Sequence, residues 1–342
     1  MTSTAKMRPS SFAQNAVNMS QYVLNASSLR PDETELAEGR SLTATLLQTI
    51  AELDSQLGGP ARPLKLPQHA WDLILARGDQ GEELSLGDYA YEFYSSAETY
   101  DLAVFFDALL QHAPAADMLD DETVEAILRL TPDAPAAGFE MLYEAICAAD
   151  CDAMQCAVTG GTLLSLDFPF WDFDRAAVMC QGSQVEIDHA SRLAHVDAIV
   201  GRRHDAVLAN LTQQNFNVLR AQAFPALLWG QDIPKQISEF PTEYLQLAFK
   251  RLAKLDGIAR GWQDTATQLP DFSDIEIKPE SDLTMQNYGA ARRFRSSAGP
   301  IVTYELHANI GRGTRIHLLI NEADRTIEIG YIGTHLPTWK FN

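Results

Sequence analysis

The sequence predicts an α+β protein in two parts. A mainly helical N-terminal domain with a few short strands spans residues 1–223, and a helical hairpin followed by an antiparallel β-meander spans residues 224–342. Three observations indicate this division. The chain, at 342 residues, is long enough for two hydrophobic cores. Apolar residues recur at helical spacing over most of the first 150 residues. After residue 290 they alternate with polar residues, as in strands that bury one face.

The first part reads as helices, then short strands, then a helix that leads into the second part. Apolar residues at three- and four-residue steps, followed by Gly-Gly or proline, predict helices over 42–59, 100–114, 120–135 and 136–158. Apolar runs separated by turn residues predict strands within 161–173 and 175–192. The helical pattern returns over 202–224. No motif in this part defines a chemistry.

Composition favours a cytoplasmic protein without structural disulfides. No apolar run is long enough for a transmembrane helix, and the first residues have no apolar segment typical of a secretory signal. Three of the four cysteines lie close together, namely Cys147, Cys151 and Cys156. A zinc site normally begins with a tighter pair and needs a second pair of ligands, so small buried thiols are the favoured interpretation.

Three aspartates after the first predicted strand, Asp167, Asp172 and Asp174, suggest a metal site or helix-capping residues in a loop. The capping interpretation is the favoured one, and we expect neither a metal nor a cofactor. The chain also lacks a P-loop, a G-x-S-x-G elbow and an H-E-x-x-H pair.

The charge is unevenly distributed. The formal net charge is −20; residues 1–225 hold 13 Lys and Arg against 32 Asp and Glu, and residues 226–342 hold 13 against 14. From residue 286 onward basic residues exceed the four acidic ones, and they are Arg292, Arg293, Arg295, Arg312, Arg315, Arg325 and Lys340. This asymmetry indicates an acidic regulatory or interaction domain beside a more basic C-terminal one, although solubility alone also explains an acidic domain.

The second part has a clearer order of elements. A strand at 225–230 precedes two helices at 232–241 and 242–262. A polar stretch follows, and strands are then predicted over 291–297, 301–308, 314–320 and 326–333, joined by short turns. This order is typical of an α+β domain.

The segments "IPKQISEFPTEYLQLAFKRLAKL" and "TRIHLLINEADRTIEIGYIGTH" make residues 224–340 resemble the RelE/ParE toxin superfamily of bacterial toxin–antitoxin modules. The first resembles the family's helical hairpin and the second its final β-hairpin. Simple family members are about as long as this part alone and are strongly basic, whereas this chain carries some 220 residues before it. The resemblance implies a toxin-type effector that cleaves mRNA on the ribosome, in stress response or phage defence. An antitoxin or another partner protein would bind through the acidic N-terminal domain.

Strand alternation predicts which side chains of the meander share a face. Short turns would place His307 opposite Arg315 and Glu305 opposite His317, with Gly330 on the other side of His317. On this register His335 lies at the rim. Tyr331 would stack on a base or, on alternation, belong to the core.

RNA cleavage requires a base, an acid and a cation near the phosphate, and imidazole and guanidinium groups suit these roles. The resemblance implies Arg315 as the phosphate clamp and His317 or His335 as proton carriers, with His307 beside them. The residues expected to bind RNA are Arg292, Arg293, Arg295, Arg312, Tyr331 and Lys340.

Two other interpretations stay open. Cross-strand Arg–Glu and His–Glu pairs stabilise sheets without any function, and charges on an edge strand prevent aggregation. On this interpretation the C-terminal domain is a non-catalytic RelE-fold subunit of a multiprotein defence complex, and it binds protein or nucleic acid. Gyrase poisoning, as in the ParE branch, is a further alternative.

Overall fold

The computed structural model describes residues 21–58, 62–66, 70–97, 99–111, 121–148, 152–263, 265, 267, 269–311 and 313–339. Helices and strands both contribute, as predicted, and the protein is of the α+β class. The chain forms two compact units, Met1–Arg202 and Arg203–Asn342. The division falls within α8 (Val196–Ala209), so α9 (Phe216–Ala223) belongs to the second unit, whereas the sequence pattern places it in the first.

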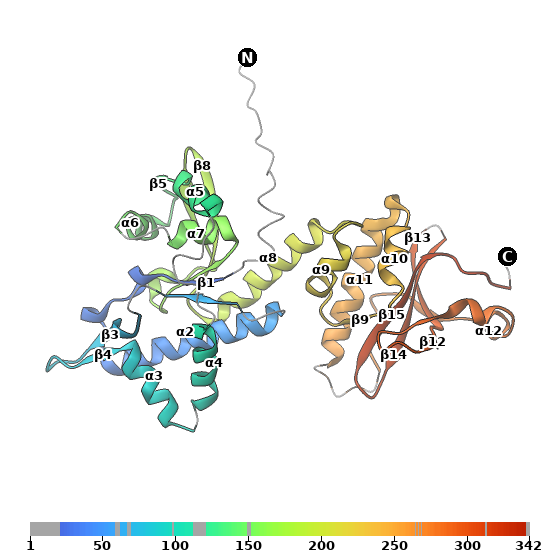
Figure 1. The fold of residues 1–342 in the computed structure, drawn as a ribbon, viewed down its shortest axis with the longest axis horizontal. Helices are drawn as coiled ribbons and strands as arrows, with labels where there is room; N and C mark the ends of the chain where they lie inside the picture. The colour runs from blue at the N-terminus through green and yellow to red at the C-terminus, as the bar shows by residue number, and fades with distance from the viewer. Residues whose placement is uncertain are drawn as a thin grey trace, which may run out of the picture. The chain divides into compact units, whose positions relative to one another are not determined.

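A mixed sheet organises the first unit (Figure 1). Within the described residues it has six strands, in the order β2 (Leu64–Lys65), β1 (Tyr22–Leu24), β6 (Thr162–Leu164), β8 (Ser183–Ala190), β7 (Arg175–Cys180) and β5 (Pro132–Pro135). The first four strands run parallel, while β7 is antiparallel to β8 and β5 is antiparallel to β7. A separate hairpin joins β3 (Ile74–Arg77) and β4 (Glu83–Ser85).

Successive side chains of β1 point to opposite faces of the sheet and pack in two separate hydrophobic cores. Tyr22 and Leu24 belong to a core that includes residues of three helices, α2 (Leu36–Leu57), α3 (Leu86–Ser95) and α4 (Tyr100–Gln111). Val23 belongs to another core, with residues of α5 (Asp121–Arg129), α6 (Glu140–Ala148) and α7 (Asp152–Thr159). The sheet is therefore covered on both faces.

The sequence pattern misses the first strands of this sheet. The periodicity up to residue 150 predicts only helices, but the structure places β1 to β5 there. The strands β1 and β2 have only three and two residues, and β1 is buried throughout, so neither shows a polar–apolar alternation. The predicted helix at 120–135 ends at Arg129, and β5 begins at Pro132.

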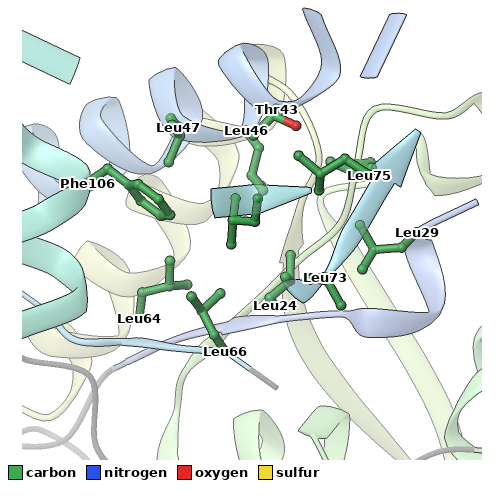
Figure 2. A pocket seen from close by; sticks show the side chains of 12 residues that line it. Leu24, Leu29, Thr43, Leu46, Leu47, Leu64, Leu66, Leu73, Leu75 and Phe106 are labelled. Carbon is green, nitrogen blue, oxygen red and sulfur yellow. The ribbon is translucent and has the colours of Figure 1, made fainter. Parts of the chain in front are cut away.

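An apolar cavity of about 20 Å³ lies in the core that contains α2 (Figure 2). Leucines line most of it, together with Phe106 and Thr43. The Thr43 hydroxyl donates to the Gly39 carbonyl in its own helix, so no polar group is left to bind water or a ligand. We interpret this space as a dry packing void.

The second unit carries its own sheet. Within the described residues the strand order is β10 (Ile277–Pro279), β13 (Leu306–Gly311), β14 (Thr314–Asn321), β15 (Thr326–Thr334) and β9 (Leu227–Trp229). The first four strands are antiparallel, and β9 is parallel to β15. The remaining elements are α10 (Ile233–Ser238), α11 (Thr242–Gln263), α12 (Asp282–Tyr288) and a small ladder of β11 (Arg293–Arg295) with β12 (Ile301–Thr303).

Helices α10 and α11 cover one face of this sheet (Figure 1). Ile316 and Leu318 of β14 are fully buried on the helix side, as is Ile329 of β15. Strand alternation therefore places Arg315 and His317 on the opposite face. This face holds the candidate site.

Candidate functional site

A β-bulge in β15 determines which residues share the candidate face. His317 pairs with Tyr331 and Leu318 pairs with Ile329, so Gly330 is an extra residue between them. The bulge reverses the alternation of β15 at this point. Tyr331 consequently lies on the face of His317, and the sequence-based placement of Tyr331 in the core is wrong.

Tyr331 packs against aromatic rings on that face. Its ring stacks on Phe294 with centroids 4.9 Å apart, and it meets the edge of His317 at 5.7 Å. Its hydroxyl donates to the Thr334 carbonyl at 2.7 Å. The bulge position requires glycine, because a Cβ on Gly330 would lie 2.4 Å from atoms of the buried Tyr304 ring.

The strand register also differs from the prediction. His307 lies opposite His317, and Asn309, not His307, lies opposite Arg315. The predicted strand over 301–308 is interrupted at Tyr304 and Glu305, but β13 continues to Gly311, so the turn to β14 is shorter than predicted and the register shifts by two residues. His307 and His317 therefore sit side by side, with ring centroids 5.6 Å apart.

Glu280 is the carboxylate of the cluster, in place of the predicted Glu305. Its Oε1 lies 2.7 Å from Arg292 Nη2 and accepts from Arg292 Nε at 2.9 Å, and it lies 3.8 Å from His307 Nδ1. Glu305 is exposed, and within the described part of the chain no contact joins its side chain to the cluster. Glu280 follows β10, in a stretch whose composition predicts a polar linker. The alternating residues at 275–278 were the signal for a strand there.

Arg292 is buried and does not reach the protein surface. Its side chain is 0% exposed, and besides Glu280 its Nη1 donates to the carbonyls of Tyr288 and Pro337. It holds Glu280, α12 and the segment after β15 together. The prediction that Arg292 binds RNA is wrong for this reason.

His317 is also buried, at 1% exposure. Its Nδ1 lies 3.1 Å from the Tyr304 carbonyl, which can only accept, so Nδ1 carries the proton. Burial lowers the pKa of His317 to about 3, with smaller contributions from His307 and the neighbouring arginines. His317 is therefore a neutral imidazole that positions its neighbours.

His307 and Arg315 are only partly buried. Burial lowers the pKa of His307, and electrostatic interactions with Arg315, Arg292 and His335 lower it as well. The negative charge of Glu280 acts in the opposite direction and raises it. His307 is thus neutral near pH 7 and able to accept a proton. Burial also lowers the pKa of Arg315, whose guanidinium nevertheless keeps its charge.

Arg315 and His307 each have one buried nitrogen atom that makes no hydrogen bond within the described structure. These atoms are Nε of Arg315 and Nδ1 of His307. Arg315 Nη1 donates to the Thr314 carbonyl at 3.1 Å, so the guanidinium is anchored at one end only. Buried polar groups without a hydrogen-bond partner cost free energy, and in folded proteins most such groups bind protein atoms or ordered water. His335, whose backbone N–H donates to Gly313, lies near enough for its charge to affect His307.

The remaining predicted RNA-binding residues divide into two groups. Arg293 and Arg295 are exposed on β11, on either side of Phe294. Arg312 and Lys340 lie outside the described residues. The structure therefore brings together His307, Arg315 and His317 near Glu280, with His335 close to His307, and places two further arginines on the surface of β11.

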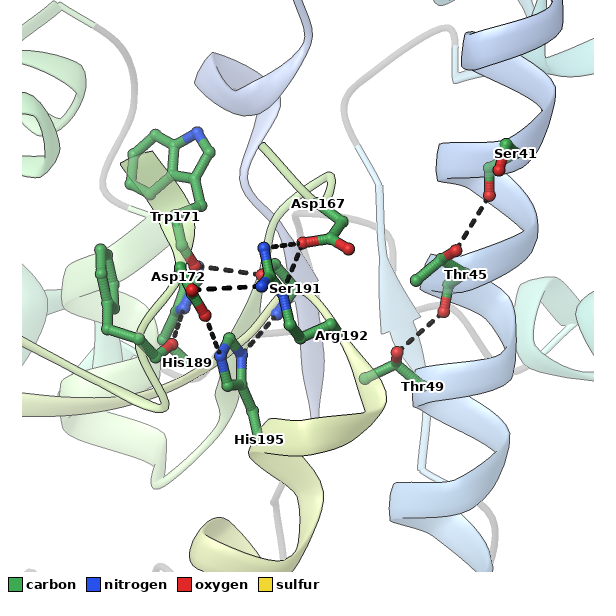
Figure 3. A network of polar contacts seen from close by, with 11 residues as sticks. Ser41, Thr45, Thr49, Asp167, Trp171, Asp172, His189, Ser191, Arg192 and His195 are labelled. Atoms are coloured by element: carbon green, nitrogen blue, oxygen red, sulfur yellow. Dashed lines mark hydrogen bonds and ion pairs between the residues drawn. The ribbon is translucent and has the colours of Figure 1, made fainter. Parts of the chain in front are cut away.

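The first unit contains a separate polar network after the parallel strands (Figure 3). Arg192 pairs with both Asp167 and Asp172, and His195 Nε2 lies 3.1 Å from Asp172 Oδ1. Asp174 pairs with Arg202. The aspartates thus bind arginines that fasten loops together, and the helix-capping interpretation of them is wrong.

Fully buried groups continue this network into the unit. Asn25 Nδ2 donates to Ser165 Oγ at 3.0 Å, and Ser165 Oγ lies 2.8 Å from His189 Nε2. His189 Nδ1 faces the Phe173 carbonyl at 2.7 Å, so Nε2 accepts from Ser165. Burial lowers the pKa of His189 to about 4. Ser165 and His189 are both 0% exposed, and substrate has no access to them.

The structure shows no metal centre within the described residues, where no group of three or more His, Cys, Asp or Glu side chains could hold an ion. The side chains of Cys156 and Cys180 are buried. The side chain of Cys147 and all of Cys151 lie outside the described residues. In the same part of the chain, no helix combines the length and apolar character needed to cross a membrane.

No family model, curated protein or solved structure matches the chain. The resemblance to RelE/ParE toxins stays a prediction based on the sequence.

Proposed function

We propose that the second unit binds RNA and cleaves its phosphodiester backbone, as a toxin-type endoribonuclease acting on mRNA at the ribosome. The observation that carries this proposal is the pair of buried, unsatisfied atoms, Arg315 Nε and His307 Nδ1, beside Glu280. A phosphate oxygen is an acceptor that satisfies the guanidinium, and Arg is the usual partner of phosphate in proteins.

The proposed chemistry divides among the partly exposed groups. Neutral His307, whose pKa is lowered by burial, takes the proton of the 2′-hydroxyl as that oxygen attacks phosphorus. Arg315 stabilises the charge that develops on the phosphorane. His335 donates a proton to the departing 5′-oxygen. His317 and Arg292 act as positioning residues for His307 and Glu280.

Supporting surfaces lie on the neighbouring strand β11. Arg293 and Arg295 are exposed there on the side of β11 opposite Phe294, and in this proposal they contact RNA backbone beyond the site itself. The stack of Phe294 and Tyr331 offers an aromatic platform for a base at the edge of the site. The acidic first unit restrains this activity, and the protein works in the cytoplasm in bacterial stress response or phage defence.

The test is cleavage of a labelled mRNA by the purified full-length chain, with and without translating ribosomes. We expect fragments that end in a 2′,3′-cyclic phosphate, and loss of at least about a hundredfold in rate for Arg315→Ala and for His307→Ala. Lys250→Ala removes an exposed cation of α11 and serves as the matched control. Equal cleavage by the wild type and Arg315→Ala refutes the mechanism.

A second candidate function is RNA or protein binding without catalysis. The burial of His317 and Arg292 favours it, because two of the predicted functional residues serve the fold instead. In this case the wild type binds RNA without cleaving it, and its expression does not arrest growth. Binding then falls with Arg315→Ala but not with Lys250→Ala.

A further inference from the structure

The first unit exposes a patch of aromatic side chains on helices α3 and α4. Tyr91 is 76% exposed, Tyr94 44%, Tyr100 51% and Val104 46%. The rings of Tyr94 and Tyr100 meet edge to face with centroids 6.2 Å apart, and Val104 follows Tyr100 by one helical turn. Single exposed apolar residues need no explanation, but these are neighbours across two helices. Tyrosine is enriched where proteins bind one another.

The sequence that carries this patch is acidic. Between residues 78 and 128 the sequence has thirteen Asp and Glu and no Lys or Arg. Asp88 and Glu92 in α3, with Asp101 and Asp107 in α4, lie on the described helices. Arg40 of α2 reaches this region, but Glu92 binds it through both carboxylate oxygens at 2.7 Å.

The acidic and aromatic groups are close to one another. Burial raises the pKa of Tyr94, and the negative charge of Asp107 and the nearby Tyr100 act in the same direction. Tyr94 also donates a long hydrogen bond of 3.4 Å to the Ala103 carbonyl, which links α3 to α4. The patch is therefore one surface. We call it the α3–α4 surface, and its residues are Tyr91, Tyr94, Tyr100, Asp101, Val104 and Asp107.

The negative charge of the α3–α4 surface determines which kind of molecule can bind to it. Nucleic acid and anionic lipid are repelled by it. A second copy of the chain, with a net charge of −20, is repelled for the same reason. A Lys- or Arg-rich segment is attracted, and tyrosine faces bind guanidinium groups in addition to apolar side chains.

We propose that the α3–α4 surface is a docking site for a basic, amphipathic segment of a partner protein. The carboxylates hold the cations of that segment, and the tyrosine rings with Val104 hold its apolar residues. This inference concerns the first unit and does not depend on RNA cleavage by the second.

The test measures binding of the full-length protein to synthetic peptides by fluorescence anisotropy. The probe is a fluorescent peptide with Arg and Leu at helical spacing, and its control has Glu in place of Arg. We expect only the basic peptide to bind, with an affinity that falls as salt is added. Hydrogen exchange should show that α3 and α4 become protected.

Substitutions localise the binding. Tyr91→Ser and Tyr100→Ser should each weaken it about tenfold, and Asp101→Lys should weaken it by a similar factor. Val218→Ser is the matched control, because Val218 is 71% exposed on α9 of the second unit, and it should leave the affinity unchanged. Binding that ignores these substitutions, or no binding of the basic peptide, overturns the proposal. Self-association that is lost in Asp101→Lys overturns it as well, because the surface then binds a second copy.

Discussion

Replacing Gly330 with alanine should destabilise the second unit by about 2–4 kcal/mol. The added methyl group would lie 2.4 Å from Tyr304 ring atoms, far inside van der Waals contact. Tyr304 is fully buried, and its hydroxyl donates to Glu328 at 2.8 Å. Overpacking of this kind costs about 1–3 kcal/mol, and moving the ring adds the loss of a hydrogen bond worth about 1 kcal/mol.

Native-state hydrogen exchange is the suitable assay, because it gives a free energy of opening for β14 and β15 separately from the first unit. Gly257→Ala is the control. Gly257 is exposed in α11, and a methyl group added there would meet no neighbouring atom, so alanine should stabilise by about 0.5–1 kcal/mol. In a Tyr304→Ala background Gly330→Ala should add little. A change below about 0.5 kcal/mol in the wild-type background refutes the close packing of the bulge.

Buried polar groups lead to three other predictions. Arg292→Met should cost about 3–5 kcal/mol, since it leaves the mostly buried Glu280 carboxylate without its arginine partner, and adding Glu280→Gln should recover part of the loss in urea denaturation. Because the pKa of His317 falls from about 6.5 unfolded to about 3 folded, the unfolded chain binds more protons, and the second unit should lose stability as pH falls between these values. His317→Gln should reduce this dependence of stability on pH. An NMR titration in which the His317 imidazole becomes protonated near pH 6 contradicts the prediction. Ser165→Ala should destabilise the first unit by about 1–3 kcal/mol, since His189 Nε2 loses its partner; a neutral effect in thermal unfolding contradicts the buried network.

Long periodic segments were predictable from the sequence, and short buried ones were not. The helices α10 and α11 and the strands β14 and β15 occur close to where the apolar pattern places them. The first strand within the described residues, Tyr22–Leu24, is buried on both faces, so its residues carry no alternation to detect. Pairing of this strand with Thr162–Leu164 joins segments 140 residues apart, and no local pattern reports such contacts.

The candidate site was predictable in composition but not in geometry. The sequence pattern points to the right strands and to four of the clustered residues, His307, Arg315, His317 and His335. Gly330 is one extra residue in β15, and it reverses which face of the sheet the following side chains, such as Tyr331, point to. A prediction from simple alternation assumes that no such bulge is present. His317 is buried, and its Nδ1 faces the Tyr304 carbonyl, which lies in the break between β12 and β13.

The parallel pairing of β9 with β15 has a consequence for synthesis of the protein. Ile327 pairs with Leu227, 100 residues earlier, and β9 is an edge strand whose neighbour in the described sheet is β15. During synthesis, β9 and the helices α10 and α11 are therefore produced long before β15. Until β15 is available, their apolar surfaces are not covered by the sheet. The sheet of the second unit therefore cannot be completed until β15 has been synthesised.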